Sequence, residues 1–78
     1  MLKYYIFWEE GNEIAYKYHP EGDEDFGVII YNKDQNTLRC DKLADVDESK
    51  TYAGMLFDKI RQFAETNNFE KEGTIAWY

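Results

Sequence analysis

The chain has very few of the residues that build reactive or covalently linked sites. Among its 78 residues it has one cysteine, Cys40, and one histidine, His19. A single cysteine excludes an intramolecular disulfide and fits a reducing compartment. A zinc site needs four Cys, His or acidic ligands, and nothing in the spacing of Cys40 and His19 makes them neighbours in a catalytic dyad. We therefore predict no catalytic residue, no metal site and no cofactor.

Basic residues and long apolar runs are also scarce. Nine Lys and Arg are scattered among sixteen Asp and Glu, which gives a formal net charge of −7. Because phosphate backbones are bound through clustered basic residues, we expect no direct nucleic-acid binding. No apolar run is long enough to span a bilayer, and Met1-Leu2-Lys3 leads into a strand pattern and not into a signal peptide. We expect a cytoplasmic protein without membrane contact.

Aromatic residues, in contrast, are abundant. They make up 18% of the chain, and 44% of the residues are hydrophobic. This composition is typical of a folded protein and differs from the aromatic-poor composition of disordered chains. The length allows one domain, residues 1–78, with one core.

One long segment, Ser49–Asn68, has the period of a helix. Its apolar residues recur at steps of three and four, which places them on one stripe. We expect Asp47 or Ser49 to be the N-cap, and Asn67-Asn68 to end the helix so that Phe69 folds back onto the stripe. Four residues are predicted to form the helix-packing core: Ala53, Leu56, Ile60 and Phe63.

Gly54 is unusual inside this helix. A glycine there costs about 1 kcal/mol relative to alanine, so the absence of a side chain needs a reason. We favour close packing of the helix against a sheet. The alternative is the close approach of a ligand or partner.

Five other segments have strand patterns. They are Leu2–Glu9, Glu13–His19, Phe26–Asn32, Thr37–Leu43 and Thr74–Tyr78. Alternation in the first segment places Leu2, Tyr4, Ile6 and Trp8 on one face, and the charged positions of the fourth are typical of an edge strand. The order ββββαβ predicts an α+β fold of two layers, in which one helix covers one face of a mainly antiparallel sheet of about five strands.

One helix leaves the other face of such a sheet uncovered, and it cannot bury fourteen aromatic residues. The candidates for an interaction surface on that face are Tyr5, Phe7, Tyr31 and Trp77. Tyrosine and tryptophan tolerate partly wet positions and are enriched at interfaces. The alternative is cross-strand aromatic pairing within the sheet, which is worth about 0.2–1 kcal/mol per pair.

Two stretches carry a family resemblance: Tyr52-Ala53-Gly54 at the helix start and Gly73-Thr74-Ile75-Ala76-Trp77-Tyr78 at the end of the chain. In these the chain resembles a set of small uncharacterised bacterial proteins, which implies an α+β domain and no particular activity. It is also similar to the partial RNase H-like domain of HicB antitoxins in its tyrosine-rich hairpin and amphipathic helix. That family has proline and glycine before the helix, where this chain has Lys42-Leu43-Ala44-Asp45.

Three functional hypotheses follow. The first is a protein-interaction module that uses the aromatic face, with acidic residues at its rim, to bind a partner protein or a second copy in a homodimer. The second is a small-ligand binder or enzyme with a site between the helix N-terminus and the sheet, near Tyr52 and Gly54, where free N–H groups favour an anion. The third, suggested by the antitoxin resemblance, is an acidic inhibitor of a basic partner. We favour the first, and hence binding over catalysis.

Overall fold

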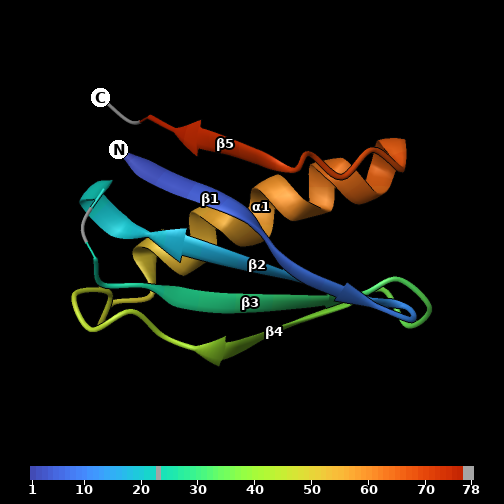
Figure 1. Cartoon of the computed structure of the whole chain (residues 1–78), viewed down its shortest axis with the longest axis horizontal. Coiled ribbons are helices and arrows are strands. Elements are labelled where there is room, and N and C mark those ends of the chain that lie inside the picture. The colour runs from blue at the N-terminus through green and yellow to red at the C-terminus, as the bar shows by residue number, and fades with distance from the viewer. Residues whose placement is uncertain (23, 77–78) are drawn as a thin grey trace.

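The computed structural model describes residues 1–22 and 24–76, which form five strands, a short 3-10 turn and one long helix (Figure 1). The elements are β1 (Leu2–Glu10), β2 (Glu13–His19), η1 (Pro20–Gly22), β3 (Gly27–Asn32), β4 (Thr37–Lys42), α1 (Thr51–Thr66) and β5 (Glu72–Ile75). All strand pairs are antiparallel, and the sheet order is β4-β3-β2-β1-β5. The predicted two-layer α+β fold is confirmed. The fifth strand begins two residues earlier than predicted.

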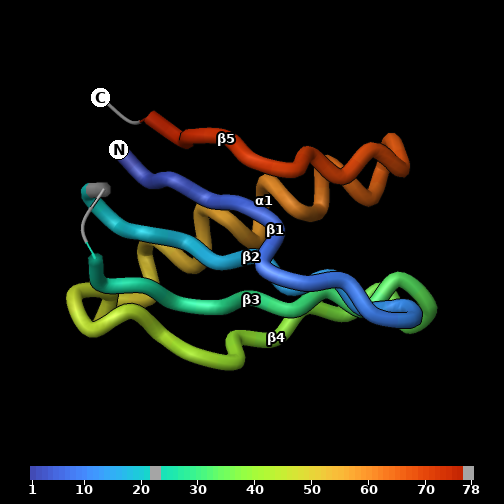
Figure 2. Tube along the Cα trace, in the orientation of Figure 1, coloured from blue at the N-terminus to red at the C-terminus, as the bar shows by residue number. Residues whose placement is uncertain are grey.

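The helix joins the two edges of the sheet. The chain leaves β4 at one edge, passes behind the strands as α1, and returns as β5 at the other edge (Figure 2). β5 pairs with β1, where Leu2 lies opposite Ile75. The strand nearest the N-terminus is therefore internal. In the described part of the chain, no helix is long and apolar enough to cross a membrane.

The covered face of the sheet, which is the face toward α1, holds the main core. The helix buries Ala53, Leu56, Ile60 and Phe63, the four residues expected there. Their partners on the sheet are large side chains: Leu2, Tyr4, Ile14, Tyr16, Tyr18, Ile29 and Tyr31. Because Ile60 is fully buried in this layer, the helix orientation agrees with the predicted apolar stripe.

Buried tyrosines hydrogen-bond to the segment that follows α1 in the sequence. The Tyr4 hydroxyl donates to a carboxylate oxygen of Glu70 (2.8 Å), and the Tyr16 hydroxyl donates to the Glu70 carbonyl oxygen (2.6 Å). Two glycines make room for such rings, because a Cβ on Gly73 would overlap Tyr4 and a Cβ on Gly27 would overlap Tyr18. Burial raises the pKa of all three tyrosines well above its ordinary value.

The N–H groups at the start of α1 are capped by the buried carboxylate of Asp47, which precedes the N-cap residue in the sequence. Lys50 is the N-cap residue, in the left-handed conformation with φ 62°, and its side chain makes no capping bond. Asp47, fully buried, accepts the backbone N–H groups of Tyr52 (3.0 Å) and Ala53 (2.8 Å) and the hydroxyl of Tyr18 (3.0 Å). The prediction of Asp47 or Ser49 as N-cap residue is wrong, although the Asp47 carboxylate satisfies the amides that such a residue would satisfy.

The helix end follows the predicted geometry. Asn67 adopts the left-handed conformation with φ 51°, and the Asn68 N–H donates to the Phe63 carbonyl oxygen (2.9 Å). Phe69 then folds back, with its ring 6.4 Å from that of Phe63 and 5.6 Å from that of Tyr31. These contacts close the core at the C-terminal end of α1.

A β-bulge in β1 changes which side chains face away from the helix. Ile6 lies opposite Tyr16, but Trp8 lies opposite Ala15, so Phe7 is an extra residue in β1. Trp8 consequently packs on the side of the sheet opposite α1. The prediction that it shares a face with Tyr4 and Ile6 is wrong, because strict alternation does not continue through the bulge.

Candidate functional site

The candidate site is the uncovered face, which is the face of the sheet turned away from α1. In Figure 1 the strands pass in front of the helix, so this face is turned toward the viewer. At its centre is a second, smaller apolar cluster whose buried members are Ala15, Val28 and Ile30. Trp8 and Phe26 pack on these residues and remain partly exposed. Two aromatic rings thus cover small aliphatic residues in the place where the other face has a helix.

Lysine side chains lie among the rings of the uncovered face. The Lys17 ammonium nitrogen lies 4.0 Å from the ring centre of Phe26 and 5.1 Å from that of Phe7. The Lys42 ammonium nitrogen lies 4.1 Å from the ring centre of Phe26 and donates to the Phe26 carbonyl oxygen (2.7 Å). These positions favour cation–π attraction, and the methylene stems of the lysines cover apolar surface. The centre of the face is therefore both aromatic and positively charged.

Tyr5 and His19 form a stacked pair beside this centre. Their ring centres are 5.7 Å apart with an interplanar angle of 21°, and the Tyr5 hydroxyl lies 3.1 Å from the His19 Nε2 atom. The ring centre of His19 is also 6.1 Å from that of Phe26. Tyr5 is thus held by its neighbours on the sheet and is partly exposed.

Phe7 differs from the other rings because 50% of its surface is exposed. Among the described aromatic residues it alone falls in the exposed class. The bulge places it next to Trp8, at the border of the apolar cluster. An exposed ring on a rigid strand is a suitable anchor for another protein, since little conformational entropy is lost when it is buried.

The four predicted surface residues have different outcomes. Tyr5 and Phe7 lie on the uncovered face, and Trp77 lies outside the described residues. The assignment of Tyr31 to this face is wrong: it is 5% exposed in the core beneath α1, and its hydroxyl donates to the side-chain oxygen of Asn36 (2.6 Å).

Sequence reasoning also missed two important rings, Trp8 and Phe26. Trp8 was missed because no glycine or proline marks the bulge in β1. Phe26 was missed because the sequence did not show which side of β3 the helix covers. The pairing of β3 with β2 would have shown which side faces the helix, because Lys17 lies opposite Val28 and both side chains face away from α1.

The only cysteine and the only histidine lie on opposite faces of the sheet. Cys40 lies opposite Ile29, whose side chain belongs to the covered face, whereas His19 stacks on Tyr5 of the uncovered face. Burial raises the pKa of the Cys40 thiol, so the nucleophilic thiolate is disfavoured. Within residues 1–22 and 24–76, no group of three or more His, Cys, Asp or Glu side chains is arranged to hold a metal ion.

A cavity of about 260 Å³ lies beside Gly54. A Cβ on Gly54 would meet no atom within 4 Å, so the prediction of close helix–sheet packing at this glycine is wrong. The cavity is not an anion site, because Asp47 already accepts the N–H groups of Tyr52 and Ala53 and the Gly54 N–H donates to the Lys50 carbonyl oxygen (2.9 Å).

Comparisons with protein-family models, curated proteins and solved structures gave no match. The functional argument is therefore built on the surfaces described above.

Proposed function

We propose that the chain is a protein-interaction module that binds a partner protein through the uncovered face of its sheet. The observation that carries the proposal is the half-exposed ring of Phe7 beside the apolar cluster under Trp8 and Phe26. No element of the described chain covers this face. Aromatic anchors with basic neighbours are typical of the residues that dominate binding energy at interfaces.

The charge of the face defines the partner. Although the whole chain has a formal net charge of −7, Lys17 and Lys42 hold positive charge over the rings at the centre of the face. A partner surface with apolar side chains next to Asp or Glu would be complementary. A symmetric dimer whose two-fold axis passes through the centre of this face would place lysines near lysines, which is electrostatically unfavourable. A partner of different sequence therefore fits better than a homodimer.

The proposal is tested by photo-crosslinking in cells that carry the gene of this protein. A photoreactive phenylalanine derivative replaces Phe7 in one variant and Gln62, an exposed residue of α1, in the control. We expect an adduct of defined mass from position 7 and none from position 62. Sedimentation of the purified chain over a range of concentrations shows whether the adduct contains a second copy. A monomeric chain that forms no adduct at position 7 would refute the proposal.

The crosslinked protein, once identified, allows a quantitative test with purified components. Removing an aromatic residue that acts as a binding hot spot typically costs 2 kcal/mol or more, so Phe7→Ala is expected to weaken binding by about 30-fold. Lys17→Glu should weaken it by at least about tenfold through charge repulsion. Lys59→Glu, with the same change of charge on α1, serves as the control and should have little effect.

A further inference from the structure

A second surface lies on the other side of the sheet, where the helix does not cover the edge strand. β4 is an edge strand, and its side chains Leu38 and Cys40 are turned toward α1 because they lie opposite Tyr31 and Ile29. Both remain partly or fully exposed. We call the groove between β4 and α1 the seam. It contains two cavities, one near each end of the helix.

The first cavity of the seam is the one beside Gly54, and it is mainly apolar. Its walls are Cys40 and Leu43 on the strand side, Ala53 and Phe57 on the helix side, and Lys50 at the helix start. A Cβ on Gly54 would meet no atom within 4 Å, and the glycine has no side chain to occupy this cavity. The volume of about 260 Å³ is sufficient for one aliphatic or aromatic side chain. The helix-weakening glycine therefore has a structural consequence, which is an open apolar cavity.

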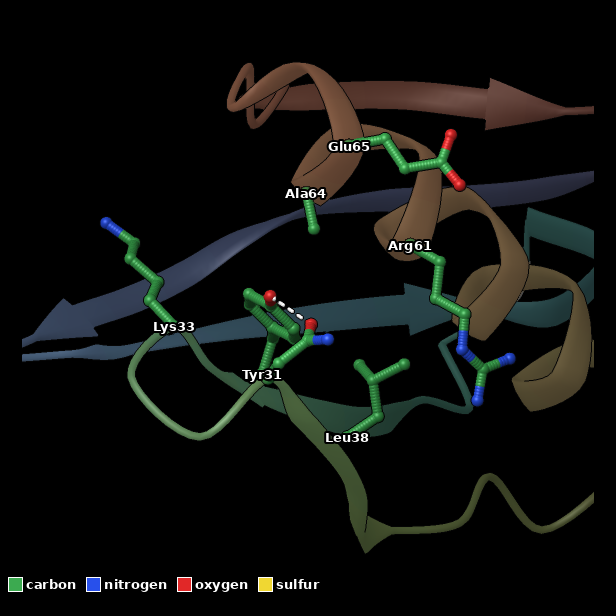
Figure 3. Close-up of a pocket in the computed structure, with 7 residues that line it drawn as sticks. Tyr31, Lys33, Leu38, Arg61, Ala64 and Glu65 are labelled. Carbon is green, nitrogen blue, oxygen red and sulfur yellow. Dashed lines mark hydrogen bonds between the residues drawn. The ribbon is translucent and has the colours of Figure 1, made fainter.

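The second cavity, of about 450 Å³, lies near the C-terminal end of α1 (Figure 3). Leu38 and the hydrogen-bonded pair Tyr31–Asn36 line it on the sheet side (Figure 3). Arg61 extends from the helix toward the strand beside this cavity, whereas Lys33, from the turn before β4, directs its ammonium group away from Arg61 (Figure 3). This cavity therefore has both polar and apolar walls, with the Arg61 cation beside it.

The positive charge of this cavity is only partly compensated. Glu65 also lines it, but in Figure 3 its carboxylate and the Arg61 guanidinium extend in different directions. Arg61 lies 3.6 Å from Asp58, and both side chains are mostly exposed, so this ion pair is weak. An acidic group placed beside the Arg61 guanidinium would meet a cation whose existing ion pair is weak.

The two cavities have the spacing of side chains on one face of a strand. Gly54 and Arg61 lie about 10 Å apart along the helix axis, and Ala53 and Ala64 about 16 Å apart. An extended peptide covers about 13 Å in four residues, after which its side chain points to the same face again. Phe57 and Arg61 connect the cavities, since the Arg61 guanidinium carbon lies 5.9 Å from the centre of the Phe57 ring.

We propose that the seam binds an extended peptide segment of a partner protein, aligned beside β4. The segment would place an apolar side chain in the Gly54 cavity and an acidic side chain, four positions away, beside Arg61. The outer backbone edge of β4 would supply main-chain hydrogen bonds, and the two cavities would supply specificity, as in other cases of strand addition. This surface is separate from the uncovered face, so its test is independent of the function proposed above.

The test is selection of a displayed library of random decapeptides on the immobilised full-length chain. We expect enriched peptides to share an apolar residue and an Asp or Glu four positions apart. An enriched peptide should perturb the backbone amide resonances of β4 and α1 in the NMR spectrum of the labelled chain. Failure to enrich any motif, or perturbation confined to the uncovered face, would overturn the proposal.

Two substitutions assign the positions of the motif to the two cavities. Gly54→Leu should fill the first cavity and weaken an enriched peptide by at least about tenfold, whereas Gly54→Ala should leave most of the cavity open and weaken it by less than about threefold. Both substitutions raise helix propensity, so both should raise the melting temperature, and weaker binding cannot be attributed to unfolding.

Arg61→Glu should reverse the preference of the second cavity, so that selection on this variant enriches Lys or Arg in place of the acidic residue. Lys59→Glu makes the same change of charge on α1 outside both cavities, and selection on it should return the original motif. An unchanged motif on both Arg61→Glu and Gly54→Leu would overturn the proposal.

Discussion

The two faces of the sheet are closed in different ways. On the covered face, a helix packs on large aliphatic and aromatic side chains. Tyrosine hydroxyls also hydrogen-bond to the segments that precede and follow the helix in the sequence. On the uncovered face, small residues such as Ala15 and Val28 are buried beneath rings and lysine stems of the sheet itself. Burial alone therefore does not distinguish the two faces. The difference lies in whether the covering layer is a secondary-structure element or single side chains.

The strongest test of this contrast is Ile60→Ala. Ile60 is fully buried at the helix–sheet interface, and loss of its side chain should leave a cavity that costs about 2–5 kcal/mol. The free energy of unfolding, measured by urea denaturation and circular dichroism, should fall by this amount. A change below about 1 kcal/mol would contradict the assignment of the covered face as the stability-determining core.

Asp47→Ala should have the next largest effect. The substitution removes the acceptor for two backbone N–H groups of α1 and for the Tyr18 hydroxyl, and we expect a loss of about 2–3 kcal/mol. Asp47→Asn keeps one acceptor oxygen and should lose less. Equal losses for the two variants, in the same urea experiment, would show that a single acceptor oxygen cannot replace the carboxylate, both of whose oxygens accept hydrogen bonds.

Alkaline pH should destabilise the covered face. Burial raises the pKa of Tyr4, Tyr16 and Tyr18 above the ordinary value near 10. In the unfolded chain these hydroxyls ionise as the pH passes 10, whereas in the folded chain they stay protonated. Ionisation therefore favours the unfolded chain, and the free energy of unfolding falls as the pH rises above 10. We expect a total loss on the order of 1 kcal/mol at pH 10.

The measurement is urea denaturation at a series of pH values between 8 and 11, together with tyrosine absorbance at 295 nm. The absorbance should show that these three hydroxyls ionise only when the chain unfolds. Stability that remains constant to pH 11 would contradict their burial.

The smallest effect is expected on the uncovered face, from Phe7→Ala. Because half of the Phe7 ring is already exposed, its removal should cost less than about 1 kcal/mol. Thermal unfolding of Phe7→Ala and Ile60→Ala under the same conditions compares the two faces directly. A loss at Phe7 as large as that at Ile60 would mean that this ring has a role in stability and not mainly in binding.

The elements of the fold were predictable where the chemistry of the sequence is regular. The steps of three and four in α1 identified its buried residues, and the two asparagines identified its end. The charged positions of the fourth strand indicated an edge, which agrees with the position of β4. In these segments, one face is apolar and the other polar, so periodicity alone determines the orientation.

The candidate site was less predictable because its strands are apolar on both faces. In β3 all residues from Gly27 to Tyr31 are buried, and no alternation shows whether Tyr31 or Ile30 lies under the helix. The bulge at Phe7 has no sequence signal of its own. The sequence offered a site beside Gly54 only as an alternative to close packing, since a glycine in a helix gives no information on whether the space beside it is filled.

The pairing of β1 with β5 has a consequence for how the chain is made. Leu2 and Ile75, which lie opposite each other, are among the described residues furthest apart in sequence. A ribosome adds about 5–20 residues per second, so β1 emerges several seconds before its second neighbour exists. During that interval the bare edge of β1 is open to other strands. Synthesis of the helix and of β5 then closes this edge, so the pairing with β5 protects β1 from aggregation.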